Sequence, residues 1–210
     1  PEFNPPTPLE ECDDDYDGIV SYFDLSIKTQ EITGDDQPGV IVTYHETLEL
    51  AESGDESITD LYTNTTEDFQ TLYVRLEDES TACVSTTTLD LIVNPIPEVL
   101  AVDDIDIYYE CDDNYDGETT FDLTSLDEIL SNEQSNISIT YYETEEDAEA
   151  GENFIPNPEN YQNISSPLQE IIVRLETEKG CYSTMTQALV VNPLATFSVT
   201  DYELCDYNGS

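Results

Sequence analysis

The sequence predicts an all-β protein built from tandem immunoglobulin-like β-sandwich domains with short helical turns. Three observations lead to this fold class. A set of short motifs occurs twice, roughly a hundred residues apart. Each copy holds about seven short segments rich in β-branched and aromatic residues, separated by turn-forming residues at regular intervals. Apolar residues make up 38% of the chain, including 14 Tyr and 6 Phe, which is enough for small β cores.

The repeat rests on motifs that return in the same order. Cys12 recurs as Cys111 and Cys83 as Cys181. The longer motifs pair Phe23-Asp24-Leu25 with Phe121-Asp122-Leu123, Val74-Arg75-Leu76-Glu77 with Val173-Arg174-Leu175-Glu176, and Val93-Asn94-Pro95 with Val191-Asn192-Pro193. We therefore expect a first repeat over residues 1–96, a second over 97–194, and the first strand of a truncated third over 195–210. This arrangement indicates a section of a longer array.

The elements of one repeat follow in order. A Pro-rich entry at residues 4–8 predicts an extended lead-in, and alternating β-formers in its counterpart at 99–109 predict a first strand. The later strands are predicted at residues 19–25, 40–46, 72–76 and 85–93, and in the second repeat at 119–123, 137–143, 171–175 and 185–191. A capping residue followed by apolar spacing of three to four at 124–130 predicts a short helical turn there and at the equivalent residues 26–32. Acidic, helix-tolerant segments lie at 48–54 and 145–151.

The net charge is extreme, with 49 acidic residues, 4 basic residues and a formal charge of -45. Such a surface repels nucleic acid phosphates and anionic membranes and attracts cations. We therefore expect no nucleic acid binding. No stretch approaches the roughly 20 apolar residues that span a bilayer, so we also expect no membrane insertion. Self-repulsion would expand the chain. We therefore expect stability that depends on Ca²⁺, on ionic strength, or on both.

An acidic loop follows the first cysteine of each repeat, Cys12-Asp13-Asp14-Asp15-Tyr16-Asp17-Gly18 and Cys111-Asp112-Asp113-Asn114-Tyr115-Asp116-Gly117. Oxygen ligands at alternate positions followed by glycine are the pattern with which a chain surrounds Ca²⁺. The loop recurs at one fixed place, which favours a metal site over an acidic turn. The candidate ligands are Asp13, Asp15, Asp17, Ile19 (through its carbonyl) and Asp24 in the first repeat, and Asp112, Asn114, Asp116, Glu118 and Asp122 in the second. Asp24 falls at position twelve of its loop but Asp122 at position eleven, so the second loop departs from the strict EF-hand spacing.

Five cysteines indicate an oxidising, extracellular setting and leave one residue over. Pairing within repeats joins Cys12 to Cys83 and Cys111 to Cys181, and leaves Cys205. Pairing across repeats joins Cys83 to Cys111 and Cys181 to Cys205, and leaves Cys12. We favour the first scheme, because the first strand of an immunoglobulin-like domain starts near the last hairpin. The sequence does not decide between them.

The remaining polar residues point away from catalysis. Arg75 and Arg174 occupy one repeat position, where a structural role toward nearby carboxylates is favoured over anion binding. His45 is the only histidine and Tyr142 replaces it in the second repeat, so no Ser/His/Asp set can be formed. We expect no enzyme. Glycosylation sequons begin at Asn64, Asn136 and Asn163.

The repeat resembles a known family. The residues that carry the resemblance are Cys-Asp-x₃-Asp-Gly, Phe-Asp-Leu, Thr-Tyr-Tyr-x-Thr, Asp147-Ala148, Asn157-Pro158-x-x-Tyr161, Val-Arg-Leu-Glu, Gly180-Cys181 and Val-Asn-Pro-Leu194. They are similar to the repeats of giant surface adhesins of Bacteroidetes, of which the gliding-motility adhesin SprB is a member. The resemblance covers nearly the whole chain, although the first repeat has Ala82 at the Gly180 position and lacks the Asn-Pro-x-x-Tyr loop. It implies type IX secretion, display at the cell surface, and adhesion or gliding.

We therefore expect a calcium-stabilised spacer segment of a secreted surface adhesin or filament. Its partners would be neighbouring repeats of the same chain, with surface polysaccharide or other adhesin chains as further partners. The alternative is a glycan-binding or accessory module of a secreted polysaccharide-degrading enzyme, which requires an exposed row of aromatic residues.

Overall fold

The computed structural model describes residues 4–20, 22–34, 39–59, 61–100 and 107–196. The chain folds into two compact units. The first consists of Pro1–Glu98 with two short segments of the second repeat, Asn136–Ser138 and Glu176–Ser183. The second holds the rest of the second repeat. Cys205 and most of the expected third repeat lie outside the described residues.

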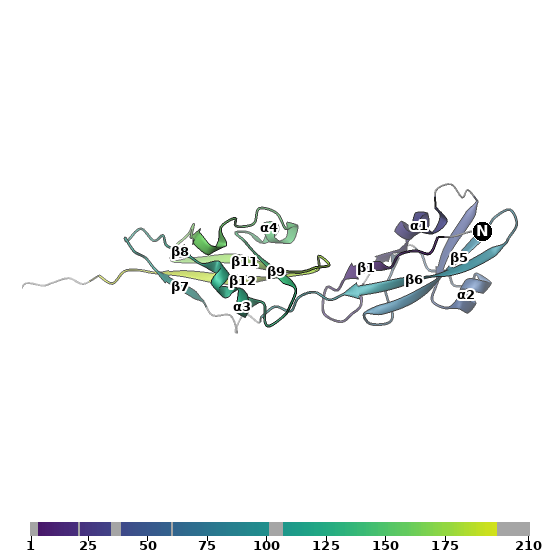
Figure 1. The fold of residues 1–210 in the computed structure, drawn as a ribbon, viewed down its shortest axis with the longest axis horizontal. Coiled ribbons are helices and arrows are strands. Elements are labelled where there is room, and N and C mark those ends of the chain that lie inside the picture. Colours follow the sequence, from purple (N-terminus) through teal and green to yellow (C-terminus); the bar gives the residue numbers. More distant parts are fainter. Residues whose placement is uncertain (1–3, 21, 35–38, 60, 101–106, 197–210) are drawn as a thin grey trace, which may run out of the picture. The chain divides into compact units, whose positions relative to one another are not determined.

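The first repeat contains one four-stranded sheet in the order β1-β6-β5-β3 (Figure 1). Its strands are β1 (Leu9–Cys12), β3 (Val40–His45), β5 (Phe69–Asp78) and β6 (Val84–Asn94). A second sheet pairs β2 (Phe23–Asp24) with β4 (Leu61–Tyr62). Strand β1 runs parallel to β6, with Leu9 opposite Leu91 and Cys12 opposite Asn94. The remaining pairs of the large sheet, β3 with β5 and β5 with β6, are antiparallel.

Short helices lie between the strands. They are η1 (Leu25–Lys28), α1 (Thr29–Thr33) and α2 (Leu48–Ser53). Asp24 caps η1 through its side chain, which accepts from the Ser26 N–H. Thr47 caps α2 in the same way, and Gly54 ends it in the left-handed conformation that glycine adopts without strain. The strand expected at residues 19–25 is reduced to two residues, because the chain turns into η1 directly after Asp24.

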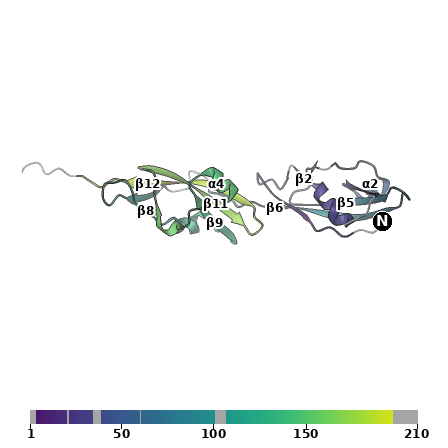
Figure 2. The ribbon, with the colours of Figure 1, turned by 90° about the horizontal axis from the view of Figure 1, so that it is seen from above.

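The second repeat has the same topology, with a sheet ordered β7-β12-β11-β9 and a β8-β10 pair. Figure 2 shows β8, β9, β11 and β12 of this repeat together with α4. Its elements are β7 (Tyr108–Cys111), β8 (Thr120–Phe121), η3 (Leu123–Leu126), α3 (Asp127–Leu130), β9 (Ile137–Tyr142), α4 (Glu145–Ala150), η4 (Pro158–Asn160), β10 (Tyr161–Gln162), β11 (Leu168–Thr177) and β12 (Tyr182–Asn192). Strand β7 is parallel to β12, and Cys111 lies opposite Asn192. The predicted all-β class with short helical turns is confirmed. Six strands form in each repeat over the described residues, instead of about seven.

The core of the first repeat is aliphatic and aromatic. Its fully buried members include Phe23, Leu25, Ile32, Leu72, Val74, Leu76, Leu89 and Leu91. Alternate residues of β5 and β6 supply most of this list, as expected for strands with one buried face. The equivalent positions of the second repeat are also fully buried, and they hold Phe121, Leu123, Ile171, Val173 and Leu175. Tyr44 and Tyr141 belong to these cores, where each hydroxyl donates to a backbone carbonyl, of Leu25 and of Leu123 respectively.

Candidate functional site

The first acidic loop begins where β1 ends, and its own backbone organises it. Asp13 is buried, and its carboxylate accepts N–H groups from Asp15 and Tyr16 at 3.2 Å each and from Gly18 at 3.0 Å. Asp15 accepts from the Asp17 N–H, and Asp17 accepts from the Ile19 N–H at 2.7 Å. Gly18 has a φ of +73°, and a Cβ there would lie 2.8 Å from an Asp68 oxygen. A side chain at this position would be strained, and glycine avoids that strain.

The carboxylates of Asp13, Asp15 and Asp17 converge on one point. One oxygen from each lies within 4.8 Å of the others, and Asp15 and Asp17 are exposed. Loss of surrounding water, followed by repulsion from Asp17, raises the pKa of Asp15. Asp24 is not a member of this cluster; its side chain caps η1. The loop thus brings together three of the four carboxylates predicted as ligands in the first repeat.

The second loop repeats this geometry. Asp112 accepts from the N–H groups of Asn114, Tyr115 and Gly117 at 2.8 to 2.9 Å, and these bonds, led by that of Asn114, lower its pKa. Asn114 accepts from Asp116, whose carboxylate accepts from the Glu118 N–H. An open cavity of about 310 Å³ beside the loop is lined partly by Asn114, Asp116 and Glu118. Asp122 instead accepts from the Thr124 hydroxyl, at the start of η3.

A buried asparagine holds each loop in place, a role that the sequence did not reveal. The Asn64 side chain accepts from the Val20 N–H at 2.7 Å and donates to the Gly18 and Thr66 carbonyls at 2.8 and 2.9 Å. Asn163 makes the equivalent three bonds in the second repeat. Both belong to sequons, yet they are only 2% and 4% exposed. Their recurrence at one repeat position was the available signal, because it reflects a structural requirement.

The disulfide contradicts both predicted pairing schemes. Cys12 is bonded to Cys181, with a Cα–Cα distance of 5.4 Å, while Cys83 and Cys111 are free and exposed. The scheme within repeats is wrong because β1 runs parallel to β6. Cys12 lies opposite the last residue of β6, whereas Cys83 precedes its first residue. An 11-residue strand separates them by roughly 35 Å, far beyond the reach of a disulfide.

The hairpin that carries Cys181 belongs to the first compact unit and makes further contacts there. Lys179 forms an ion pair with Glu10 at 2.7 Å, and this bond, together with a smaller effect of Asn94, lowers the pKa of Glu10. The Tyr16 hydroxyl of the acidic loop and the Ser183 hydroxyl both donate to the Pro97 carbonyl, at 2.8 and 2.7 Å. The acidic loop and the disulfide are therefore parts of one contact region.

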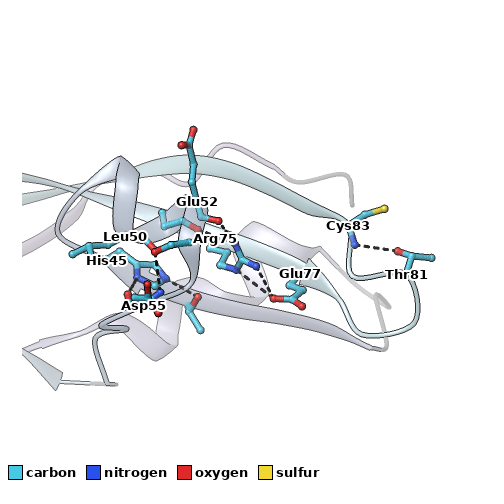
Figure 3. Close-up of polar contacts among 11 residues, drawn as sticks. His45, Leu50, Glu52, Asp55, Arg75, Glu77, Thr81 and Cys83 are labelled. Carbon is cyan, nitrogen blue, oxygen red and sulfur yellow. Dashed lines mark hydrogen bonds and ion pairs between the residues drawn. The ribbon is translucent and has the colours of Figure 1, made fainter.

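The single histidine and Arg75 have structural contacts (Figure 3), and Arg174 repeats those of Arg75 in the second repeat. His45 is fully buried, with Nδ1 2.9 Å from the Asp55 carbonyl and Nε2 2.9 Å from the Thr43 hydroxyl. Arg75 donates to the Ala51 and Glu52 carbonyls at the end of α2 and pairs with Glu77 at 2.8 Å. Arg174 reaches the carbonyls of Ala148 and Glu149, at the same position of α4.

Comparison with known families identifies the repeat. The model of the Flavobacterium inter-domain disulphide bond domain matches residues 8–97 and again residues 106–195. The chain belongs to this family. Two copies of this domain are consistent with an extracellular repeat protein of Bacteroidetes. The bond between Cys12 and Cys181 joins a residue of one matched domain to a residue of the other, in agreement with the family's description. No curated protein matches the chain.

Solved structures give distant similarities. The human desmocollin-1 ectodomain is 11% identical over 91% of this chain and 40% of its own, with a TM-score of 0.26. The EC1-2 fragment of human mucin-like protocadherin is 13% identical over 91% of this chain and 98% of its own, with a TM-score of 0.24. Titin A168169 is 12% identical over 75% of this chain and 86% of its own, with a TM-score of 0.24. Among the described residues, no helix is long and apolar enough to cross a bilayer.

Proposed function

We propose that this chain is a calcium-stabilised spacer segment of a secreted cell-surface adhesin or filament that serves adhesion and gliding. The observation that carries the proposal is the Cys12–Cys181 bond, which ties the last hairpin of the second repeat to the end of β1 in the first. A covalent tie at this place resists separation of consecutive repeats under load. The resemblance to SprB-like repeats supports export by type IX secretion and display on the cell surface.

The loop chemistry supports Ca²⁺ as the stabilising cation. Asp13, Asp15 and Asp17 offer carboxylate oxygens, which hard cations prefer, and Asn114 offers an amide oxygen in the second repeat. Backbone N–H groups already orient these side chains, so little ordering is required when an ion binds. The chain has a net charge of -45, and an ion bound in the first loop would neutralise part of the negative charge that lies next to the disulfide.

Calorimetry at low ionic strength tests this role. A site filled at a hundred times its dissociation constant stabilises the fold by about 2.7 kcal/mol. We expect CaCl₂ to raise the melting temperature by several degrees over an EDTA sample whose ionic strength is matched with NaCl. The double variant D15N/D17N should lose the part of this difference that belongs to the first repeat. The control E49Q/E56Q removes the same charge at exposed positions outside the loop and should keep it. Equal melting of the unsubstituted chain in CaCl₂ and EDTA would refute the calcium role.

One cavity favours the alternative of glycan binding. In the second repeat, an open cavity of about 380 Å³ is lined partly by Phe154, Asn157, Asn160 and Tyr161. Phe154 is 56% exposed, and aromatic rings with nearby amides suit sugar rings and their hydroxyls. Titration with neutral oligosaccharides, comparing the chain with F154A, distinguishes this function from a spacer role. Binding that F154A abolishes would support the alternative.

A further inference from the structure

An open cavity in the second repeat is built beside a carboxylate that both repeats hold in the same way. The Tyr161 hydroxyl donates to Glu143 at 3.2 Å and accepts from the Gln169 side-chain amide. In the first repeat, the Tyr62 hydroxyl donates to Glu46 at 3.0 Å and accepts from the glutamine at the same place. Both tyrosines are buried, so each exposed glutamate is held by a fixed donor at the surface.

The loop before this tyrosine differs between the repeats. Ile58 and Ile155 occupy equivalent positions, because each donates its N–H to the carbonyl of a core tyrosine at 2.8 Å. From that isoleucine to the tyrosine that supports the carboxylate, the first repeat has residues 59–61 and the second has residues 156–160. Directly before the isoleucine, a serine of the first repeat is replaced by Phe154. The second repeat therefore adds an aromatic ring and a longer loop next to the shared carboxylate.

The cavity, with a volume of about 380 Å³, offers a ligand three kinds of group. Glu143 supplies one negative charge, and the described residues that line the cavity include no lysine, arginine or histidine. Phe154 supplies an aromatic ring that is 56% exposed. Asn157 and Asn160 supply side-chain amides that form no hydrogen bond within the described part of the chain. A charge, an aromatic surface and two free amides thus meet in one place.

These groups together select one chemical class of ligand. The carboxylate and the ring both attract an organic cation, the first through its charge and the second through its negative face. Side-chain amides bond hydroxyl groups in either direction, because each amide has donors and an acceptor. The charge of -45 on the chain repels acidic polysaccharides. A ligand with a positive charge, hydroxyls and an apolar ring face satisfies all three groups, and a protonated amino sugar has this composition.

We propose that this cavity binds a protonated amino sugar residue of a polysaccharide. The ammonium group pairs with Glu143, and the apolar face of the sugar ring packs on Phe154. Asn157 and Asn160 bond the hydroxyls of the sugar. A lysine side chain carries the same charge but has no hydroxyls for the two amides, so the site favours a polysaccharide over a basic protein. The proposal rests on the glycan-binding alternative stated above and does not involve the calcium-stabilised spacer role.

Isothermal titration calorimetry with two trisaccharides of glucosamine tests the proposal. One trisaccharide has free amino groups, which are protonated at mildly acidic pH, and the other is N-acetylated and neutral. Both are measured at physiological ionic strength, which screens the attraction between separated exposed charges. We expect the free-amino trisaccharide to bind the chain about 2- to 12-fold more tightly, the factor that corresponds to one hydrogen bond.

Two variants test whether Glu143 causes this difference. E143Q removes the charge but keeps an oxygen that accepts from the Tyr161 hydroxyl. It should weaken binding of the free-amino trisaccharide by about the same factor and leave binding of the neutral one unchanged. The matched control E46Q removes one charge from the same setting in the first repeat, where the loop is shorter. It should leave both affinities unchanged, and melting temperatures check that both variants are folded.

The remaining outcomes contradict the proposal in different ways. Equal weakening by E143Q and E46Q would show diffuse attraction to an acidic surface and overturn the proposal. Equal binding of the two trisaccharides, lost in F154A, would overturn the amino sugar but leave the glycan-binding alternative, whereas binding of neither would overturn both. A lysine tripeptide with blocked ends that bound as tightly as the free-amino trisaccharide, and more weakly to E143Q, would show that charge alone is recognised. That result would also overturn the proposal.

Discussion

Replacing Asn64 by alanine should destabilise the first repeat, mainly because the backbone N–H of Val20 loses its hydrogen-bond acceptor. The change removes the acceptor of the Val20 N–H and the donor to the Gly18 and Thr66 carbonyls. Gly18 keeps a second bond, from the Asp68 N–H at 3.0 Å, and Thr66 is exposed to water. Val20 is buried, so its N–H has no replacement partner.

The magnitude follows from these three bonds. A buried donor left without a partner costs about 1–3 kcal/mol, and each lost hydrogen bond about 0.5–1.5 kcal/mol. We expect N64A to lower the unfolding free energy of the first repeat by about 2–4 kcal/mol. At roughly 4–8 °C per kcal/mol for a domain of this size, its melting transition should fall by more than about 8 °C. N163A should lower the transition of the second repeat by less, because Thr119, whose N–H loses its acceptor, is only partly buried.

Differential scanning calorimetry of the oxidised chain measures both transitions. The matched control is T66A, which destroys the same sequon but leaves the Asn64 side chain and the Thr66 carbonyl in place. T66A should melt within about 2 °C of the unsubstituted chain, because surface substitutions usually change stability by less than about 0.5 kcal/mol. If N64A melted as T66A does, the asparagine would not be holding the loop, and this reasoning would fail.

Two further predictions concern charged side chains. The Thr7 N–H, followed by Lys28, lowers the pKa of Glu31 to about 2. Since the folded pKa lies below the unfolded one, the stability that Glu31 adds is present above about pH 4.5 and is lost as the pH falls toward 2. The difference in unfolding free energy between the unsubstituted chain and E31Q, measured in urea, should therefore vanish over that range. A difference that stayed constant would contradict this prediction. R75M should lower the unfolding free energy by about 1–3 kcal/mol, because it removes the hydrogen-bond donor to the Ala51 and Glu52 carbonyls at the end of α2. The matched control R75K keeps the charge and should lower the unfolding free energy by less. Equal stability of R75M and the unsubstituted chain in urea unfolding would show that water replaces the guanidinium.

The local features were readable in the sequence because neighbouring residues produce them. Alternating apolar residues in 72–76 and 171–175 place one face of β5 and β11 in the core. The spacing of Asp13, Asp15 and Asp17 determines a turn in which each carboxylate accepts an N–H two to five residues later. Recurrence of these motifs in the second repeat identified the repeat without any knowledge of the fold.

The tertiary structure alone decided which cysteines meet and what Asn64 does. Both depend on contacts between residues far apart in the chain, and no local pattern encodes these. The parallel pairing of β1 with β6 carries Cys12 to the end of the sheet opposite the hairpin of its own repeat. The same packing buries Asn64 against Val20 and the acidic loop. Composition and spacing determine what each segment can form, and the register between distant strands determines which side chains can reach one another.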